Sequence, residues 1–366
     1  MKPGAVLLLS TFGLLAAGLA CGQPPPAPVA EPPTLTLALP APRVLSISAS
    51  PRLIPEPTVR EWLEATGMAY DAGARGAFAD WRWSSLESAP GQFTLSEPQE
   101  DTDFLGRSQD LTLLIGLQLL NTTDREVPTD LLEEPFDSAE MQVRFRRLVD
   151  TLAPLLDRHV RYLSIGNEVD VYLGAHPEEW DAYRAFLDDA SAYVHSVLPW
   201  IQIGTTVTFG GATSVNAERI EALTSASDVL IFTYYPLEVD FRVQPPDVPL
   251  ADFPRMVEMA GGRPVILQEV GYPSAERLGS SERAQAEFVE QAFLAWQAEG
   301  ERIPFLNYFL LHDLTAEMCS QLQGYYGLRE VGLEAFLCSL GLRQADGTPK
   351  EAWQTFLDAV RASGLP

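Results

Sequence analysis

The sequence is poor in cysteine, histidine and basic residues, and each shortage excludes a class of protein. Its 366 residues include three cysteines and four histidines, too few for a zinc ribbon or for a scaffold built on several disulfides. Lysine and arginine number 25 against 50 aspartates and glutamates, so the formal net charge is −25. Because this charge repels phosphate backbones and anionic lipid headgroups, we expect no nucleic-acid partner. With 46% hydrophobic residues, the chain is also too apolar for a disordered protein.

The N-terminus predicts export. Lys2 precedes an apolar run over residues 5–19, and residues 1–20 have the organisation of a signal peptide. The run is about 15 residues long, shorter than the roughly 20 residues that a membrane-spanning helix needs. The stretch Gly18-Leu19-Ala20-Cys21 resembles the lipobox of bacterial lipoproteins, although Gly18 stands where that motif usually has Leu. We therefore expect a membrane-anchored lipoprotein of the cell envelope, lipidated at Cys21, or a secreted protein with Cys21 free.

Residues 21–42 form a proline-rich tether ahead of a single domain, residues 43–366. Eight of the 21 residues from Gly22 to Pro42 are proline, and proline at this density favours an extended chain that builds no core. The only expected contact with a membrane is the lipid anchor. In an exported domain we predict that Cys319 and Cys338 pair as a disulfide, the alternative being two separate buried thiols.

From Arg43 onward, short runs of β-branched or aromatic residues alternate with longer segments of helical period, which predicts βα units around a parallel sheet. Eight such strands match the (β/α)8 barrel, also called a TIM barrel. The competing architecture is a doubly wound open sheet, but residues 48–51 lack the glycine-rich loop that it needs. The predicted strands are 43–48, 73–81, 111–120, 160–166, 201–208, 229–235, 264–268 and 303–311. The predicted helices are 58–67, 138–157, 177–198, 216–225, 250–260, 281–300 and 350–362.

Two glutamates lie at the ends of predicted strands, where a barrel of this kind assembles its active site. Glu168 follows the fourth strand and Glu269 follows the seventh. A carboxyl at the end of a hydrophobic strand is partly desolvated, which raises its pKa and suits it to donate a proton near neutral pH. Two facing carboxyls are what glycoside hydrolysis requires, and a separation of about 5 to 5.5 Å gives retention through a covalent intermediate. Each glutamate alone is also compatible with capping a helix or pairing with an arginine.

At these residues the chain resembles the large clan of retaining glycosidases on (β/α)8 barrels. Asn167-Glu168 is similar to the Asn-Glu pair on strand four of that clan, and residues 268–273, Gln-Glu-Val-Gly-Tyr-Pro, look like the Glu-Thr-Gly-Trp-Pro turn of its endo-β-glucanases and galactanases. Residues 83–93 resemble its Trp-x-x-Leu-Glu-Pro-x-x-Gly-x-Phe segment, and residues 347–350 resemble the stretch before its last helix. The resemblance implies that Glu168 is the general acid/base, that Glu269 is the nucleophile and that Asn167 binds the sugar hydroxyl beside the anomeric carbon.

Aromatic side chains near the strand ends are candidates for sugar contacts, because ring faces stack on the apolar faces of sugars. The resemblance also implies that a tyrosine ending strand six bonds the nucleophile, and the sequence leaves Tyr234 and Tyr235 both open. For any single ring, ordinary packing is the alternative. The predicted substrate-binding residues are Asn167, Trp81, Trp83, Tyr234, Tyr235, Tyr272, Tyr308 and His312.

The chain also departs from the clan at three strand ends. Strand eight reads Asn307-Tyr308-Phe309 without the usual Trp, and strand three ends in Asn121-Thr122-Thr123 without a His. Near strand two, the sequence leaves open whether Arg75, Arg82 or neither positions the nucleophile. Sugar specificity therefore does not follow from these positions. We expect the insertion between Asp313 and Gly347 to form one wall of the cleft.

These observations predict an enzyme that hydrolyses β-glycosidic bonds in a poly- or oligosaccharide with retention, as a monomer and without a cofactor. The histidines are too scattered for a metal-dependent hydrolase, so we expect no metal site. The alternative is a catalytically silent, glycan-binding lipoprotein that keeps the glycosidase-like barrel.

Overall fold

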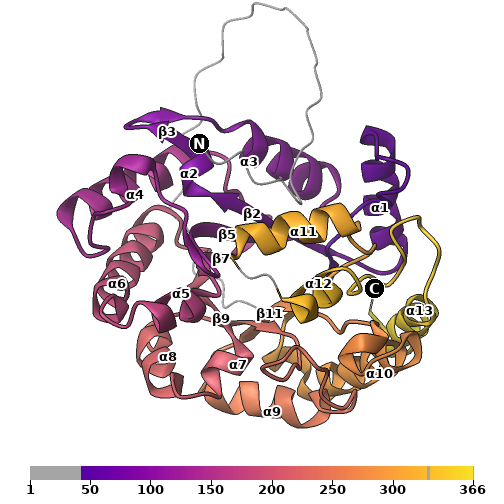
Figure 1. Ribbon diagram of the computed structural model, residues 1–366. Helices are drawn as coiled ribbons and strands as arrows, with labels where there is room; N and C mark the ends of the chain where they lie inside the picture. The colour runs from indigo at the N-terminus through magenta and orange to yellow at the C-terminus, as the bar shows by residue number, and fades with distance from the viewer. Residues whose placement is uncertain (1–42, 328–329, 366) are drawn as a thin grey trace, which may run out of the picture.

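The part of the chain that the structure describes, residues 43–327 and 330–365 of a computed structural model, forms a closed barrel of parallel strands inside a ring of helices (Figure 1). The predicted signal peptide, the tether and Cys21 lie outside these residues. Strand five consists of β8 and β9, which pair with β7 and β10 respectively and so close the ring. The strands are β1 (Val44–Ile47), β2 (Gly76–Arg82), β5 (Thr112–Asn121), β7 (Val160–Asn167), β8 (Gln202–Gly204), β9 (Thr206–Thr208), β10 (Leu230–Tyr234), β11 (Val265–Val270) and β12 (Phe305–Tyr308).

This architecture confirms the predicted (β/α)8 barrel, and all of the predicted strands and helices are present. Side chains fix several helix starts: the hydroxyl of Ser138 accepts from the Met141 N–H, and that of Ser281 accepts from the Ala284 N–H. The predicted helices are α1 (Val59–Asp71), α4 (Ala139–Leu152), α6 (Trp180–Val197), α8 (Ala217–Thr224), α9 (Pro249–Met259), α10 (Glu282–Glu299) and α13 (Glu351–Ser363). The structure adds α2 (Trp83–Leu86), α3 (Ser96–Asp101), a π-helix (Thr102–Ser108), α5 (Val169–Ala175), α7 (Phe209–Ala212), α11 (Ala316–Tyr325) and α12 (Val331–Leu337).

Side chains along each barrel strand alternate between the interior of the barrel and the surrounding helices. On β11, Ile266 packs inside with Tyr162 and Phe305, whereas Val265 and Leu267 pack outward. A third hydrophobic cluster lies beneath α11 and α12 and includes Leu310, Leu314, Cys319, Leu333, Phe336, Leu337 and Leu340. The core therefore has an inner layer, an outer layer and a cap.

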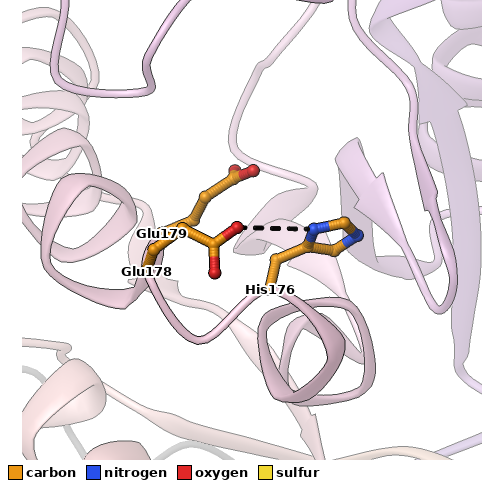
Figure 2. A group of neighbouring side chains, drawn as sticks. All are labelled: His176, Glu178 and Glu179. Carbon is orange, nitrogen blue, oxygen red and sulfur yellow. Dashed lines mark ion pairs between the residues drawn. The ribbon is translucent and has the colours of Figure 1, made fainter.

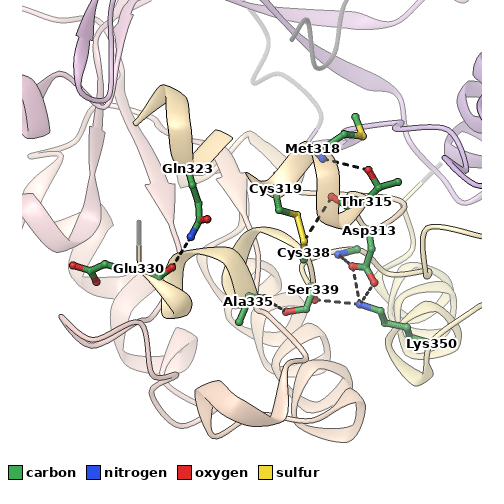
Figure 3. The surroundings of a disulfide bond; sticks show 11 residues. Asp313, Thr315, Met318, Cys319, Gln323, Glu330, Ala335, Cys338, Ser339 and Lys350 are labelled. Carbon is green, nitrogen blue, oxygen red and sulfur yellow. Dashed lines mark hydrogen bonds and ion pairs between the residues drawn. A yellow bond between two sulfur atoms is a disulfide. The ribbon is translucent and has the colours of Figure 1, made fainter. Parts of the chain in front are cut away.

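The cap is the insertion between Asp313 and Gly347, and in Figure 1 its helices α11 and α12 lie over the centre of the barrel. Cys319 and Cys338 form a disulfide with a Cα–Cα distance of 5.9 Å, which confirms the predicted pairing. As Figure 3 shows, the Lys350 ammonium donates to Asp313 at 2.8 Å and to the Ser339 carbonyl at 3.1 Å. These bonds fasten both ends of the insertion to the start of α13.

A disulfide of this kind is typical of oxidising compartments, which agrees with the expected export. Within residues 43–327 and 330–365, every helix is too short or too polar to cross a membrane.

The segment that resembles the clan around Trp83 builds a hairpin of β3 (Glu87–Ala89) and β4 (Gln92–Phe93). The Glu87 carboxylate is fully buried and accepts from Trp83 Nε1 at 2.9 Å and from the Gly91 N–H at 2.7 Å. Arg144, also buried, pairs with it at 3.0 Å. Glu87 therefore organises this hairpin.

We expect Arg144→Met to lower the free energy of unfolding by about 3 to 5 kcal/mol, because the buried Glu87 charge loses its ionic partner. Arg147→Met is the matched control on α4, since Arg147 is exposed and its replacement is expected to change stability by less than about 0.5 kcal/mol. Urea unfolding of the two variants measures the difference. Equal unfolding midpoints would contradict the role given to this ion pair.

Candidate active site

Glu168 and Glu269 line one cavity at the C-terminal ends of the barrel strands, with a volume of about 390 Å³. The two glutamates come from strand positions four and seven, as predicted from the sequence. Size and position are those of a small-molecule site in this type of barrel. The other polar residues lining the cavity are Asp80, Arg82, Gln118, Asn121, Thr122, Thr123, Asn167, Tyr235 and Tyr326.

An unusual backbone turns Glu168 toward the cavity. Gly166 has a φ of +87°, and a Cβ atom there would lie 2.4 Å from the Tyr183 hydroxyl oxygen, so glycine is required. Glu168 itself has a φ of +46°, in the left-handed region that non-glycine residues rarely adopt. Because regular alternation ends at Gly166, Asn167 and Glu168 both reach the cavity.

A bulge in β11 turns Glu269 inward. Phe232 of β10 pairs with Leu267, but the next residue, Thr233, pairs with Glu269, so Gln268 is an extra residue in the ladder. The side chain of Gln268 bonds to Asn167 and Thr206 inside the barrel, while Glu269 lines the cavity. Without the bulge, alternation would place Glu269 on the outer face beside Leu267.

Hydroxyl groups contact both carboxyls. Glu168 accepts from Thr233 through Oε1 at 2.7 Å and from Thr122 through Oε2 at 2.8 Å. Glu269 accepts from the Tyr235 hydroxyl through Oε2 at 2.6 Å. Tyr235 is therefore the strand-six tyrosine that the sequence left unassigned.

Burial dominates the acid–base behaviour of the pair. It raises the pKa of Glu168, against which the Thr233 and Thr122 hydroxyls act. Burial also raises the pKa of Glu269, and the negative charge of Glu168 adds to this. Because each ionised carboxylate disfavours ionisation of the other, the two groups titrate as a coupled pair, and between its two titration steps the pair shares one proton.

A buried polar network fixes Asn167 beside Glu168. Its side-chain amide donates to Asn121 Oδ1 at 3.0 Å, and its Oδ1 accepts from Gln268 Nε2 at 2.7 Å. Thr206 donates to Gln268 Oε1 at 2.7 Å. The network joins strands three, four, five and seven, so it sets the relative orientation of the strands that carry the two glutamates.

Two further ionisable residues enter the cavity from β2. The pKa of Asp80 is raised to about 6 by burial, with the Arg82 charge acting in the opposite direction. Arg82 is the arginine that lines the cavity. It lies 3.8 Å from the Glu126 carboxylate and over the Tyr325 ring. Arg75 instead donates to the Ala74 carbonyl, before β2 begins. The sequence did not lead us to predict Asp80 as a site residue. A charged residue inside a strand of small and aromatic residues does, however, indicate an unusual polar position.

We expect Asp80→Asn to shift the acid limb of the kcat/KM profile toward lower pH by up to about one unit. The negative charge of Asp80 is among the causes that raise the pKa of Glu269. Its removal lets Glu269 lose its proton at lower pH. Asp80→Glu keeps the charge and is expected to keep the limb in place. A shift toward higher pH in Asp80→Asn would contradict the assignment, whatever happens to the absolute rate.

Six of the predicted sugar-binding residues lie outside the cavity, each at most 3% exposed, and we remove them from the site. Strand alternation or a local turn directs their side chains toward helices and loops instead. Trp81 donates to Asp101 and Trp83 to Glu87. Tyr234 donates to Asp252, and Tyr272 to the Gln244 carbonyl. The Tyr308 ring packs on Phe356, and His312 bonds to Ser50 and Arg343.

Phe309 replaces Tyr308 as the strand-eight aromatic residue of the cavity. It directly follows β12. The sequence prediction placed it inside a strand and assigned it no contact with substrate. Phe309 therefore occupies the region where the clan usually carries a Trp.

One cluster outside the cavity has the composition of a metal site, namely His176, Glu178 and Glu179 (Figure 2). His176 lies 3.9 Å from Glu178. Glu179 accepts from the Tyr172 hydroxyl at 3.2 Å and lies 3.8 Å from Arg125. Because protein partners already engage these groups, we assign no metal to them.

Comparison with known proteins identifies the fold. No protein-family model matches the chain, and no curated protein matches it in sequence. A solved GH5_18 variant from Bifidobacterium longum subsp. longum, in complex with Manb1-4GlcNAc, has a TM-score of 0.68 and 16% identity over 88% of this chain and 79% of its own. The exo-beta-1,4-mannosidase Op5Man5 from Opitutaceae bacterium strain TAV5 has a TM-score of 0.67 and 17% identity over 87% of this chain and 59% of its own.

A family 39 glycoside hydrolase from Bacteroides cellulosilyticus WH2 has a TM-score of 0.60 and 14% identity over 87% of this chain and 64% of its own. At these identities the likeness concerns the fold. The chain therefore has the (β/α)8 barrel fold that these structures share.

Proposed function

We propose that the protein is a glycoside hydrolase that cleaves β-glycosidic bonds with retention of configuration. The observation that carries the proposal is the pair of partly buried carboxyls, Glu168 and Glu269, at the ends of strands four and seven and facing one cavity. A pair of this kind supplies both the acid and the nucleophile that retention requires.

The hydrogen bonds favour one distribution of the shared proton. Tyr235 is partly buried, and burial raises its own pKa, so its neutral hydroxyl donates to Glu269 and favours the carboxylate there. The threonine hydroxyls at Glu168 can rotate to accept a hydrogen bond from a protonated carboxyl as well as donate one to a carboxylate. We therefore assign the proton to Glu168 and the negative charge to Glu269.

The reaction then follows in two displacements. Glu269 attacks the anomeric carbon as Glu168 protonates the departing oxygen, so the glycosidic bond breaks and a glycosyl ester forms. Glu168, now ionised, removes a proton from water, which attacks the same carbon and releases Glu269. Asn167 has one amide hydrogen bonded to Asn121, and we assign its second amide N–H to the sugar hydroxyl beside the anomeric carbon.

The substrate that we propose has one terminal β-linked sugar in the cavity, because about 390 Å³ suits a ligand of modest size. Two structures of similar fold support this choice, one in complex with Manb1-4GlcNAc and one named as an exo-beta-1,4-mannosidase. We further propose that the enzyme acts as a monomer outside the cytoplasm, held to the membrane by a lipid on Cys21 and the tether over residues 21–42.

The second candidate is a glycan-binding protein without turnover. It is favoured by one observation, that the lining of the cavity holds Phe309 and contains no tryptophan within the part of the chain described by the structure. The carboxyl pair favours hydrolysis, and the two candidates differ in whether a covalent glycosyl-enzyme forms.

The test is incubation with aryl β-glucoside, β-mannoside and β-galactoside, followed by proton NMR of the first-formed sugar. We expect the β-anomer to appear first. A 2-deoxy-2-fluoro glycoside with a fluoride leaving group is expected to inactivate the enzyme and to label the peptide that contains Glu269. First appearance of the α-anomer would contradict retention, and binding without hydrolysis or labelling would favour the second candidate.

A further inference from the structure

The cavity has a polar side and an apolar side. The ends of β2, β5 and β7, which are neighbours in the barrel, contribute Asp80, Asn121 and Asn167 to the polar side. The apolar side comes from the opposite part of the barrel, where residues after β10 and β12 and the insertion contribute side chains. It contains six leucines: Leu237, Leu314, Leu322, Leu333, Leu337 and Leu340.

The apolar side is a wall of side chains that is supported by buried residues and by a disulfide. Leu314, Leu333, Leu337 and Leu340 are buried in the cluster beneath α11 and α12, and Cys319 in the same cluster forms the disulfide that joins the two ends of the insertion. Leu237, Leu322 and Phe309 pack against this cluster but stay partly exposed, and all three line the cavity. The buried leucines support the wall, and the partly exposed ones present its surface.

Such a wall does not suit a second sugar. Every hydroxyl of a buried glycosyl residue needs a hydrogen-bond partner, because an unpaired polar group in an apolar site is costly. The leucines offer neither a donor nor an acceptor, and the rings of Phe241, Phe309 and Phe336 on the same side carry no polar group. The two hydroxyls on this side, of Tyr235 and Tyr326, are already engaged by Glu269 and Thr122. The sugar that is transferred therefore takes the polar side, and the group that departs faces the leucines.

We propose that the preferred substrates are β-glycosides of apolar alcohols, in which the leaving group is an alkyl or aryl alcohol instead of a sugar. The proposal rests on the hydrolytic function proposed above. The reaction adds water across the glycosidic bond and releases a free sugar and the alcohol, whose oxygen takes its proton from Glu168. The alkyl or aryl part gains free energy by leaving water for the leucine wall.

The test compares substrates with the same sugar and different leaving groups: methyl, butyl and octyl β-D-glucoside, the matching β-D-mannosides, and the corresponding β-1,4-linked disaccharides, all below micelle-forming concentration. We expect kcat/KM to increase with alkyl length, by up to about fourfold per methylene group, and to be highest for the octyl glycosides. A disaccharide cleaved as well as or better than the octyl glycoside would overturn the proposal.

Calorimetric binding of the same compounds separates this proposal from the proposed function. If no compound is cleaved, the hydrolytic function fails, and the apolar specificity is then decided by binding alone. Tighter binding of octyl glucoside than of the disaccharide supports the wall as a binding surface, and equal or weaker binding overturns it.

A variant at the wall gives the second test. Leu322→Asn is expected to lower the ratio of kcat/KM for octyl glycoside over disaccharide about tenfold, because a polar amide replaces part of the apolar surface. Leu294→Asn is the control, since Leu294 lies on α10 and is 47% exposed. Leu237→Asn, in the segment after β10, repeats the test if Leu322→Asn in α11 unfolds. An unchanged ratio in a folded wall variant would overturn the proposal.

Discussion

Replacement of Glu269 by alanine is expected to lower kcat by several orders of magnitude, because the group that attacks the anomeric carbon is gone. The fold should tolerate the change, since Glu269 is a partly buried acid, and desolvation and repulsion from Glu168 both raise its pKa. Far-ultraviolet circular dichroism and urea unfolding check that the variant is folded. Tyr235→Phe is the milder comparison, because it removes the hydrogen bond to Glu269 and keeps the nucleophile.

Addition of azide to the Glu269→Ala variant tests whether Glu269 is the nucleophile. A small anion can enter the space left by the carboxylate and attack the anomeric carbon from the same face. The product from an aryl β-glycoside is then the α-glycosyl azide, of inverted configuration, and the rate recovers with azide concentration. Formation of the β-azide, or an activity close to that of the unchanged enzyme, would show that Glu269 is not the nucleophile.

The sequence predicts the barrel well because its signal is repeated along the chain. Each strand is a short apolar run, and each long helix has an apolar face at helical spacing, so errors at one element leave the others intact. The two glutamates were found for a related reason: the barrel places the end of every strand on one face. The order of the elements therefore predicted that Glu168 and Glu269 lie at the same end of the barrel.

The remaining residues of the site depend on details that a pattern does not contain. Tyr234 and Tyr235 are neighbours in the sequence, yet the first contacts Asp252 outside the barrel and the second contacts Glu269 inside it. The inward position of Glu269 depends on one extra residue in β11, and a shift of one residue exchanges the two faces of a strand. Trp81, Trp83, Tyr272 and Tyr308 were assigned to the site by position alone. The alternation of side chains along a strand, or a local turn, places each of them outside the cavity.

The insertion illustrates a different limit. Its disulfide and its place as one wall of the cleft were predicted, but the leucine surface was not, because the leucines come from α11, α12 and three segments outside helices, one of which lies far away in sequence. Only the folded chain brings Leu237 and Leu322 to one surface. Substrate preference, as far as the wall sets it, is therefore a property of tertiary packing.

Replacement of Glu168 by alanine is expected to lower kcat/KM by an amount that depends on the leaving group of the substrate. An alkyl alcohol is a poor leaving group and needs the proton from Glu168, so its kcat/KM should fall by about 10² to 10⁴-fold. A dinitrophenyl group departs without a proton, so the first displacement on a dinitrophenyl β-glycoside should keep most of its rate. The second displacement lacks its base, and we expect a burst of dinitrophenol followed by slow turnover.

The pH dependence and the azide product complete the assignment. Burial raises the pKa of Glu168, so activity on alkyl glycosides should be full while this carboxyl is protonated and should fall as the pH rises through that pKa. With dinitrophenyl glycosides the alanine variant should lose this basic limb. Thr233→Val, which removes one hydrogen bond to Glu168, is expected to keep it.

Azide attacks the glycosyl ester in the Glu168→Ala variant, so the expected product is the β-glycosyl azide, opposite in configuration to that from Glu269→Ala. Two variants that gave the same anomer would contradict the division of roles, because the two carboxyls act on opposite faces of the sugar.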